Sequence, residues 1–178
     1  MGKCTTLNKT SSVLASEAST LASVLTLVND IRAKLKGDYN VSYPGLAVGT
    51  TATDVASVAF DYTLSGIQYA KAAVAAGTAP GTDVIPQSKY GAIALDINAA
   101  GTISVAKAAA NATGYASEAL ALAGIPALAA GKARMGTVSV IKSDAAFTFG
   151  TTDLDAANVT TEIENGETYL SAIGAVAA

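Results

Sequence analysis

The sequence predicts an α+β protein in which an N-terminal amphipathic helix precedes a small antiparallel β-domain of successive hairpins with one short covering helix. Three observations predict this class: heptad-spaced apolar residues within residues 5–36, alternating apolar residues around a turn in residues 89–107, and two similar segments flanking that turn. We expect residues 1–38 to form an N-terminal helical attachment or oligomerisation segment and residues 39–178 to form a β-rich domain.

The N-terminal helix is predicted from large apolar residues that recur at heptad spacing. One position of the repeat is filled by Leu7, Leu14, Leu21, Val28 and Leu35, and the complementary position of the second half by Val24 and Ile31. Serine and threonine residues lower the helix propensity of the first half. The candidate residues for self-association or docking therefore lie in the second half, and they are Leu21, Val24, Val28, Ile31 and Leu35.

Two partners for this apolar face remain open. Leu25 and Leu27 make the face wider than the seam of a two-stranded coiled coil, which suits packing against copies of the same chain in an oligomer, with a trimer favoured. The same helix could instead dock on the β-domain of its own chain. Lys34 and Lys36 suit a helix C-terminus, and Gly37 ends the predicted helix.

The β-domain is predicted from turn residues set between alternating apolar residues. In residues 89–107, KYGAIALDINAAGTISVAK, two alternating runs flank the segment from Asn98 to Gly101. Gly101 can adopt the positive φ that a tight turn needs, so this stretch is expected to be a complete β-hairpin.

Two flanking segments repeat this pattern. Residues 58–72 alternate around Ser65-Gly66, and residues 137–149 alternate around Ser143-Asp144-Ala145, so we expect a hairpin in each. Residues 38–53, which contain Tyr43-Pro44-Gly45, are expected to form a connection.

A short covering helix is predicted over residues 111–124. Thr113 or Asn111 is its candidate N-cap, and Gly124 followed by Pro126 is its stop signal. A last strand is expected at residues 159–163.

Composition and charge exclude several classes of partner. The 178 residues are 51% hydrophobic and only 14% charged, with a net charge of −3, so the basic patch of a nucleic-acid-binding protein is missing. The single cysteine, Cys4, excludes an internal disulfide framework. We also expect neither a signal peptide nor a membrane span, because no long uninterrupted apolar run occurs.

The sequence offers few of the residue types that enzymes commonly use in catalysis. Histidine is absent, which removes the usual general base and the commonest metal ligand. The acidic pairs Asp153/Asp155 and Glu162/Glu164 are expected to be solvated. We therefore expect no catalytic, cofactor-binding or metal-binding residue, no cofactor and no enzymatic activity.

Residues 96–104 resemble the opening of a calcium-binding loop. Asp96, Asn98 and Gly101 match its first, third and sixth positions, but Lys107 stands where the loop needs its last carboxylate. A β-turn explains the same residues better, so no calcium site is predicted.

The blocks YGAIALDINAAGTI, NATGYASEALALAGIPAL and MGTVSVIKSDAAFTFGTT, between Tyr90 and Thr152, resemble virion structural proteins of tailed bacteriophages. The resemblance implies a non-enzymatic capsid decoration (cement) protein that binds the outer surface of a phage head. Its partners would be the major capsid protein of the same virion and further copies of the chain, with no nucleic acid and no membrane. Its location would be the virion, at the capsid surface, after synthesis in the host cytoplasm.

Two other functions stay open. A head-fibre or tail-associated, receptor-facing adhesin module would be favoured if its tyrosines were exposed in one patch, namely Tyr39, Tyr43, Tyr62, Tyr69 and Tyr90. A carbohydrate-acting enzyme would need two acidic residues facing each other across a cleft.

Overall fold

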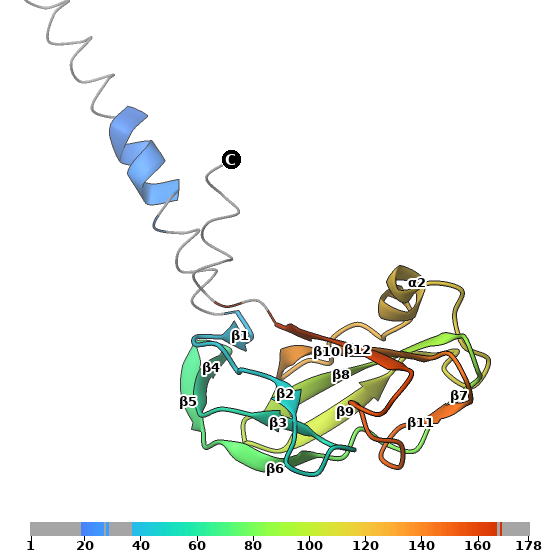
Figure 1. Cartoon of the computed structure of the whole chain (residues 1–178). Coiled ribbons are helices and arrows are strands. Elements are labelled where there is room, and N and C mark those ends of the chain that lie inside the picture. The colour runs from blue at the N-terminus through green and yellow to red at the C-terminus, as the bar shows by residue number, and fades with distance from the viewer. Residues whose placement is uncertain (1–18, 27, 29–36, 167, 169–178) are drawn as a thin grey trace, which may run out of the picture. The chain divides into compact units, whose positions relative to one another are not determined.

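The structure, a computed structural model, describes residues 19–26, 28, 37–166 and 168. The chain divides into two compact units, Met1–Lys36 and Gly37–Ala178, and each is considered by itself. We call the second unit the β-domain. Figure 1 shows its strands gathered in layers, with the short helix α2 (Glu118–Ala123) beside them.

The predicted α+β class is wrong, because the part of the chain that the structure describes is mostly β, with 43% strand and 11% helix. Of the helix predicted over residues 5–36, residues 19–26 and 28 are described and helical, and the rest lies outside the described residues. Short strands also occupy residues 38–53, which were expected to be a connection. Such strands depend on partners distant in the sequence, and local pattern does not display these partners.

Twelve strands are present in the described part of the β-domain. They are β1 (Tyr39–Asn40), β2 (Ala47–Val48), β3 (Val55–Ser57), β4 (Phe60–Leu64), β5 (Ile67–Lys71), β6 (Val74–Thr78), β7 (Val84–Ile85), β8 (Tyr90–Asn98), β9 (Ile103–Lys107), β10 (Lys132–Lys142), β11 (Phe147–Thr148) and β12 (Val159–Asn165).

The central sheet has the strand order β12-β10-β8-β9, and all its pairs are antiparallel. Strand β8 is buried on both faces, as its nearly continuous apolar sequence requires. Ile93 and Leu95 project into the main core, whereas Ala92 packs with Ala121 of α2 on the opposite face. The core therefore lies on one face of this sheet, and α2 covers part of the other, which we call the outer face.

Three smaller sheets complete the domain, with the orders β1-β4-β5, β2-β3-β6 and β11-β7. Their inward side chains close the main core against the central sheet, notably Val55, Phe60, Tyr62, Ile85 and Phe147. A β-bulge between Arg134 and Gly136 shifts the register of β10 against β8.

Two of the three predicted hairpins are confirmed. Strands β8 and β9 pair around a turn in which Gly101 has a φ of 73°. Strands β4 and β5 pair from Leu64↔Ile67 outward, and Ser65 and Gly66 both have positive φ in the two-residue turn between them.

The third predicted hairpin, over residues 137–149, is wrong. Strand β10 pairs with β8 and β12, whereas β11 pairs with β7. Alternation identified the strand correctly, but adjacency in the sequence did not identify its partner. The last strand, expected at residues 159–163, is confirmed as β12.

The covering helix is shorter than predicted. Its N-cap is Ser117, which accepts a hydrogen bond from the Leu120 N–H, and it ends at Gly124 as expected. Asn111 is not the cap, because its buried side chain bonds both the N–H and the C=O of Ala92 at 3.0 Å. In this way Asn111 acts as a partner for β8.

Tyr62 gives a test of the contact between the small sheets and the central one. It is 1% exposed, and its hydroxyl donates to the Asn98 carbonyl at 2.8 Å. Tyr62→Phe is expected to lower the free energy of unfolding by about 1 kcal/mol in denaturant titrations at neutral pH. The control Tyr69→Phe should cost less, because no hydrogen bond of the Tyr69 hydroxyl joins it to another described residue.

The same tyrosine gives the wild type a pH dependence at alkaline pH. Burial, with a smaller contribution from Tyr69, raises the pKa of Tyr62 above its ordinary value of 10.0. The unfolded chain therefore ionises first, so this contribution to stability is complete below pH 10.0 and is lost as pH rises through the folded pKa. Tyr62→Phe should lack that loss, and equal alkaline destabilisation of both chains would contradict the assignment.

Candidate functional site

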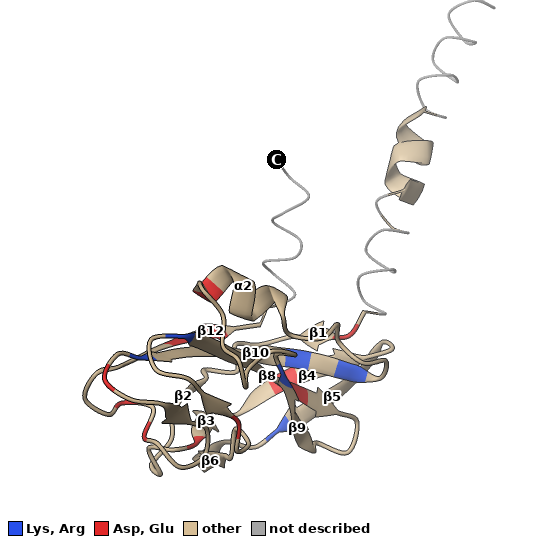
Figure 2. Cartoon of the chain, turned by 90° about the vertical axis from the view of Figure 1, so that its right-hand side faces the viewer, with Lys and Arg blue, Asp and Glu red and all other residues tan. Residues whose placement is uncertain are grey.

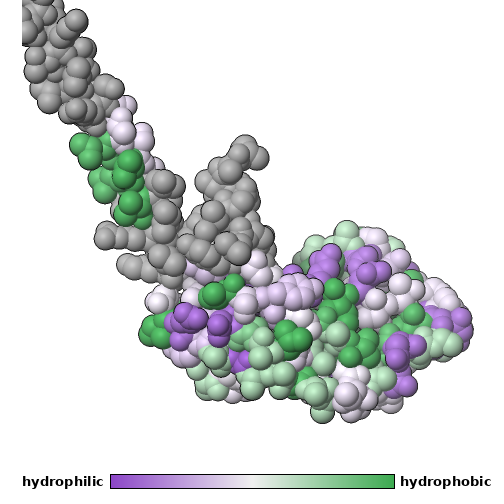
Figure 3. Space-filling view, turned by 60° about the vertical axis from the view of Figure 1, so that its left-hand side comes forward, coloured by the Kyte–Doolittle hydropathy of each residue, from purple (hydrophilic) through white to green (hydrophobic). Residues whose placement is uncertain are grey.

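The helical residues 19–26 and 28 present an apolar stripe without a partner among the described residues. Leu21 is 68% exposed, Val24 51%, Leu25 60% and Val28 38%. At 100° per residue these four side chains fall on one side of the helix. Figure 3 shows the resulting hydrophobic surface in green on this segment. We call these four residues the apolar stripe.

The opposite side of the same helix is polar and satisfied by itself. The Ser23 hydroxyl donates to the Ser19 carbonyl at 3.0 Å, and the Thr26 hydroxyl donates to the Ala22 carbonyl at 2.9 Å. Because these hydroxyls bond their own helix, this side needs no partner. The apolar stripe, in contrast, is stabilised only when another surface buries it.

Of the five residues predicted for self-association or docking, Leu21, Val24 and Val28 belong to this stripe. Ile31 and Leu35 lie outside the described residues. The role predicted for all five stays a prediction, and Leu25 extends the described surface.

The two ends of the described part of the β-domain lie next to each other. Asn40 in β1 forms a parallel bridge with Thr168, and the Gly166 N–H donates to the Met135 carbonyl at 2.7 Å. Asn165 fixes the end of β12, since its side-chain oxygen accepts from the Leu46 N–H and its amide nitrogen donates to the Tyr43 hydroxyl. The first and last described parts of the domain are therefore neighbours.

A pocket of about 350 Å³ opens beside this place, on the outer face of the central sheet. Its walls come from the start of β1, the loop before β10, the bulged part of β10 and the end of β12. They include Asp38, Tyr39, Leu128, Arg134, Thr137 and Glu164. We call this the outer pocket.

The one basic residue of the outer pocket is already neutralised. Arg134 binds the Asp96 carboxylate through Nε at 2.9 Å and through Nη2 at 3.4 Å, and it also donates to the Pro126 carbonyl. The Asp96 side chain is 5% exposed. Acidic and basic residues stand next to each other on β8 and β10 in Figure 2, in agreement with this pair.

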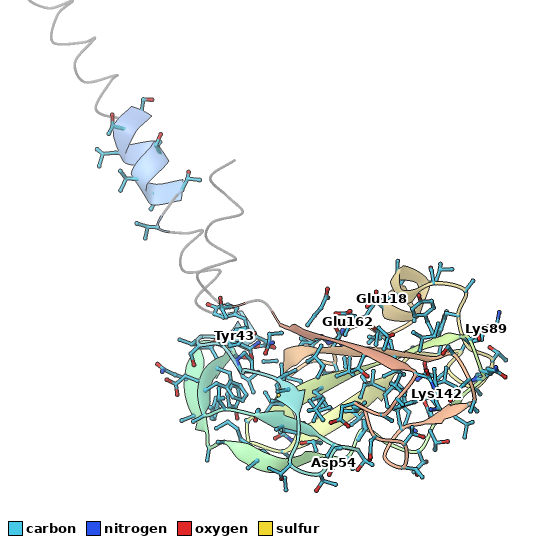
Figure 4. The ribbon with its side chains drawn as sticks, in the orientation of Figure 1. Tyr43, Asp54, Lys89, Glu118, Lys142 and Glu162 are labelled. Carbon is cyan, nitrogen blue, oxygen red and sulfur yellow. The ribbon has the colours of Figure 1, made fainter. Side chains whose placement is uncertain are left out.

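The acidic pair Glu162/Glu164 lies on the outer face of the edge strand β12, where Ser139 and Thr137 of β10 are their register partners. Figure 4 shows Glu162 on the same side of the domain as Glu118, which accepts a hydrogen bond from the Ser139 hydroxyl. Only Glu164 lines the outer pocket. Asp153 and Asp155 lie in the turns that precede β12.

The residues that resemble a calcium loop have other partners. Asp96 is held by Arg134, and the Asn98 side chain accepts from the N–H groups of Ala100 and Thr102 within the hairpin turn. No group of three or more metal-ligating side chains occurs in the described part of the chain. Likewise, none of its helices is long and apolar enough to cross a membrane.

The tyrosines do not form the single exposed patch that an adhesin surface would need. Tyr62 is buried and stacks on Tyr69, with ring centroids 5.5 Å apart, whereas Tyr43 is 61% exposed. Tyr39 and Tyr90 are half-buried. These side chains contribute to packing at several places.

The outer pocket is not predictable from the sequence. Asp38, Arg134 and Glu164 come from segments far apart in the chain, and pairing of β10 with β12 brings the last two together. No local pattern marks such a site, although residues two apart on a strand, such as Glu162 and Glu164, share a face.

The fold and site define a β-rich domain joined to a helix with an exposed apolar stripe. No protein-family model matches the chain, and no curated protein and no solved structure is significantly similar to it.

Proposed function

We propose that this protein is a non-enzymatic virion structural protein, a capsid decoration (cement) protein that binds the outer surface of a phage head. The observation that carries the proposal is the apolar stripe, whose four side chains are exposed on their helix, while the β-domain has its own closed core. The resemblance of residues 90–152 to virion proteins of tailed phages supports the same class.

The partner proposed for the apolar stripe is the same helix in other copies of the chain, in a trimer. Leu21 and Val28 occupy one heptad position and Val24 the other, and Leu25 widens the face beside them. The step from Leu21 to Val24 places leucine at the first position and a β-branched residue at the second, which favours more than two strands, and a wider apolar face does the same. Burying a Leu or Val side chain contributes about 1.5–3 kcal/mol, so four per chain favour association.

A decoration protein stabilises a shell by adding contacts between neighbouring subunits of the major capsid protein. In a trimer, three β-domains are linked, so the second and third contacts with a symmetric shell become intramolecular. Weak individual contacts are then sufficient for stable attachment. This mechanism needs no catalytic residue.

The test is rebinding to phage heads. Heads of the phage that encodes the chain, prepared without the protein, are mixed with the purified chain and sedimented. We expect saturable co-sedimentation at a fixed number of copies per head and a higher temperature of head disruption. A chain that stays in the supernatant at all concentrations would contradict the proposal.

A further inference from the structure

The outer pocket carries negative charge that the domain itself does not neutralise. Asp38 accepts one hydrogen bond through Oδ1, from the Ser65 N–H at 2.7 Å, and Glu164 forms no ion pair with any described residue. The guanidinium of Arg134 is engaged by Asp96. The pocket therefore holds two carboxylates without a counter-charge from the described residues.

The rest of the β-domain is also negatively charged. Residues 37–178 contain six basic and twelve acidic residues, so the charge of the whole β-domain is negative. Three of the described basic residues, Lys107, Arg134 and Lys142, are in ion pairs with Asp83, Asp96 and Asp144. A cation that approaches the outer face meets an attractive field.

The pocket also has surfaces for an aliphatic stem. Leu128 and Tyr39 line it together with the carboxylates, and so does Thr137, whose hydroxyl group is able to accept a hydrogen bond. A lysine or arginine side chain buries its methylene groups on apolar surface while its charged head meets oxygen atoms. The two carboxylates and one hydroxyl can accept the three N–H donors of an ammonium group.

We propose that the outer pocket binds a basic side chain, lysine or arginine, presented by a protein partner. The proposal rests on the proposed function, because on a phage head that side chain would belong to the major capsid protein. The pocket would thus supply the specific polar contact of each β-domain, whereas the apolar stripe links the copies of the chain.

The experiment uses the full isotope-labelled chain and follows its backbone amide resonances during titration with Nα-acetyl-lysine amide. Amides of Gly136, Thr137 and Leu128 are expected to shift saturably, in the millimolar range, and less at high salt. The Nε-acetylated form of the same compound has no charge and should not saturate these amides. A methyl glucoside is titrated in parallel, to test whether the pocket binds a sugar instead.

Two variants locate the response. Glu164→Gln removes one charge, and Asp38→Asn removes the other while it keeps the oxygen that accepts the Ser65 N–H. Each is expected to weaken lysine binding about two- to fivefold, the range of partly exposed ion pairs. Glu162→Gln is the matched control, because it changes the same strand and face outside the pocket, and it should leave binding unchanged.

Several results would overturn the proposal: no saturable shift at the pocket amides, equal binding by the neutral compound, saturation by the glucoside alone, or equal effects of Glu164→Gln and Glu162→Gln. Head binding is scored separately. A chain that binds lysine at the pocket but fails to bind heads removes the decoration function and leaves the basic-side-chain site. A chain that binds heads but shows no response to the lysine compound keeps the decoration function and removes the basic-side-chain site.

Discussion

Replacing Val24 and Val28 together by aspartate is expected to convert the assembled chain into monomers. Both side chains belong to the apolar stripe, and two carboxylates per copy would be placed in the seam between helices. Burying unpaired charges costs more than the association of the remaining leucines contributes. Sedimentation velocity of the full chain measures the effect, with a trimer for the wild type and a monomer for the variant.

The matched control is Ser23→Asp with Thr26→Asp. These residues lie on the opposite, polar side of the same helix, so the control adds the same charge and a similar loss of helix propensity. It should remain a trimer. If both variants dissociate, charge or helix stability controls assembly, and the apolar stripe is not the contact.

Arg134→Met is expected to destabilise the β-domain by about 3–5 kcal/mol, because it leaves Asp96 as a buried, uncompensated charge. The carboxylate of Asp96 is 5% exposed, and Arg134 is its ion-pair partner among the described residues. Denaturant titration at neutral pH measures the loss. Lys107→Met is the control: its pair with Asp83 is more exposed, so its removal should cost less than about 1 kcal/mol.

A second substitution separates the charge from the packing. When Asp96→Ala is added to Arg134→Met, the unpaired charge disappears, so the double variant should be more stable than Arg134→Met alone. A double variant that is no more stable than Arg134→Met would show that the methylene contacts of Arg134, or its bond to Pro126, cause the loss.

The two hairpins were predictable because their information is local. Ser65-Gly66 and the segment ending in Gly101 combine alternating strands with residues that accept positive φ, and both turns have that geometry. The end of α2 at Gly124 followed from a local stop signal in the same way.

The sheet order was not predictable, because it depends on pairings between distant segments. Strand β10 was expected to pair with residues 147–149. It pairs instead with β8 on one edge and β12 on the other, and its apolar face is turned inward. The role of Asn111 was not predictable for the same reason, because its side chain bonds β8 and does not cap a helix. The outer pocket exists only once these pairings are made, so its residues carried no signal in the sequence.

Assembly through the N-terminal helix is tested most directly by the mass of the chain in solution, measured by light scattering with and without residues 1–36. The β-domain has its own core, so it is expected to stay folded alone. If the apolar stripe holds the copies together, the full chain is a trimer and the chain that begins at Gly37 is a monomer. A trimer in both forms would contradict this expectation by assigning assembly to the β-domain, and a monomer in both would remove self-association altogether.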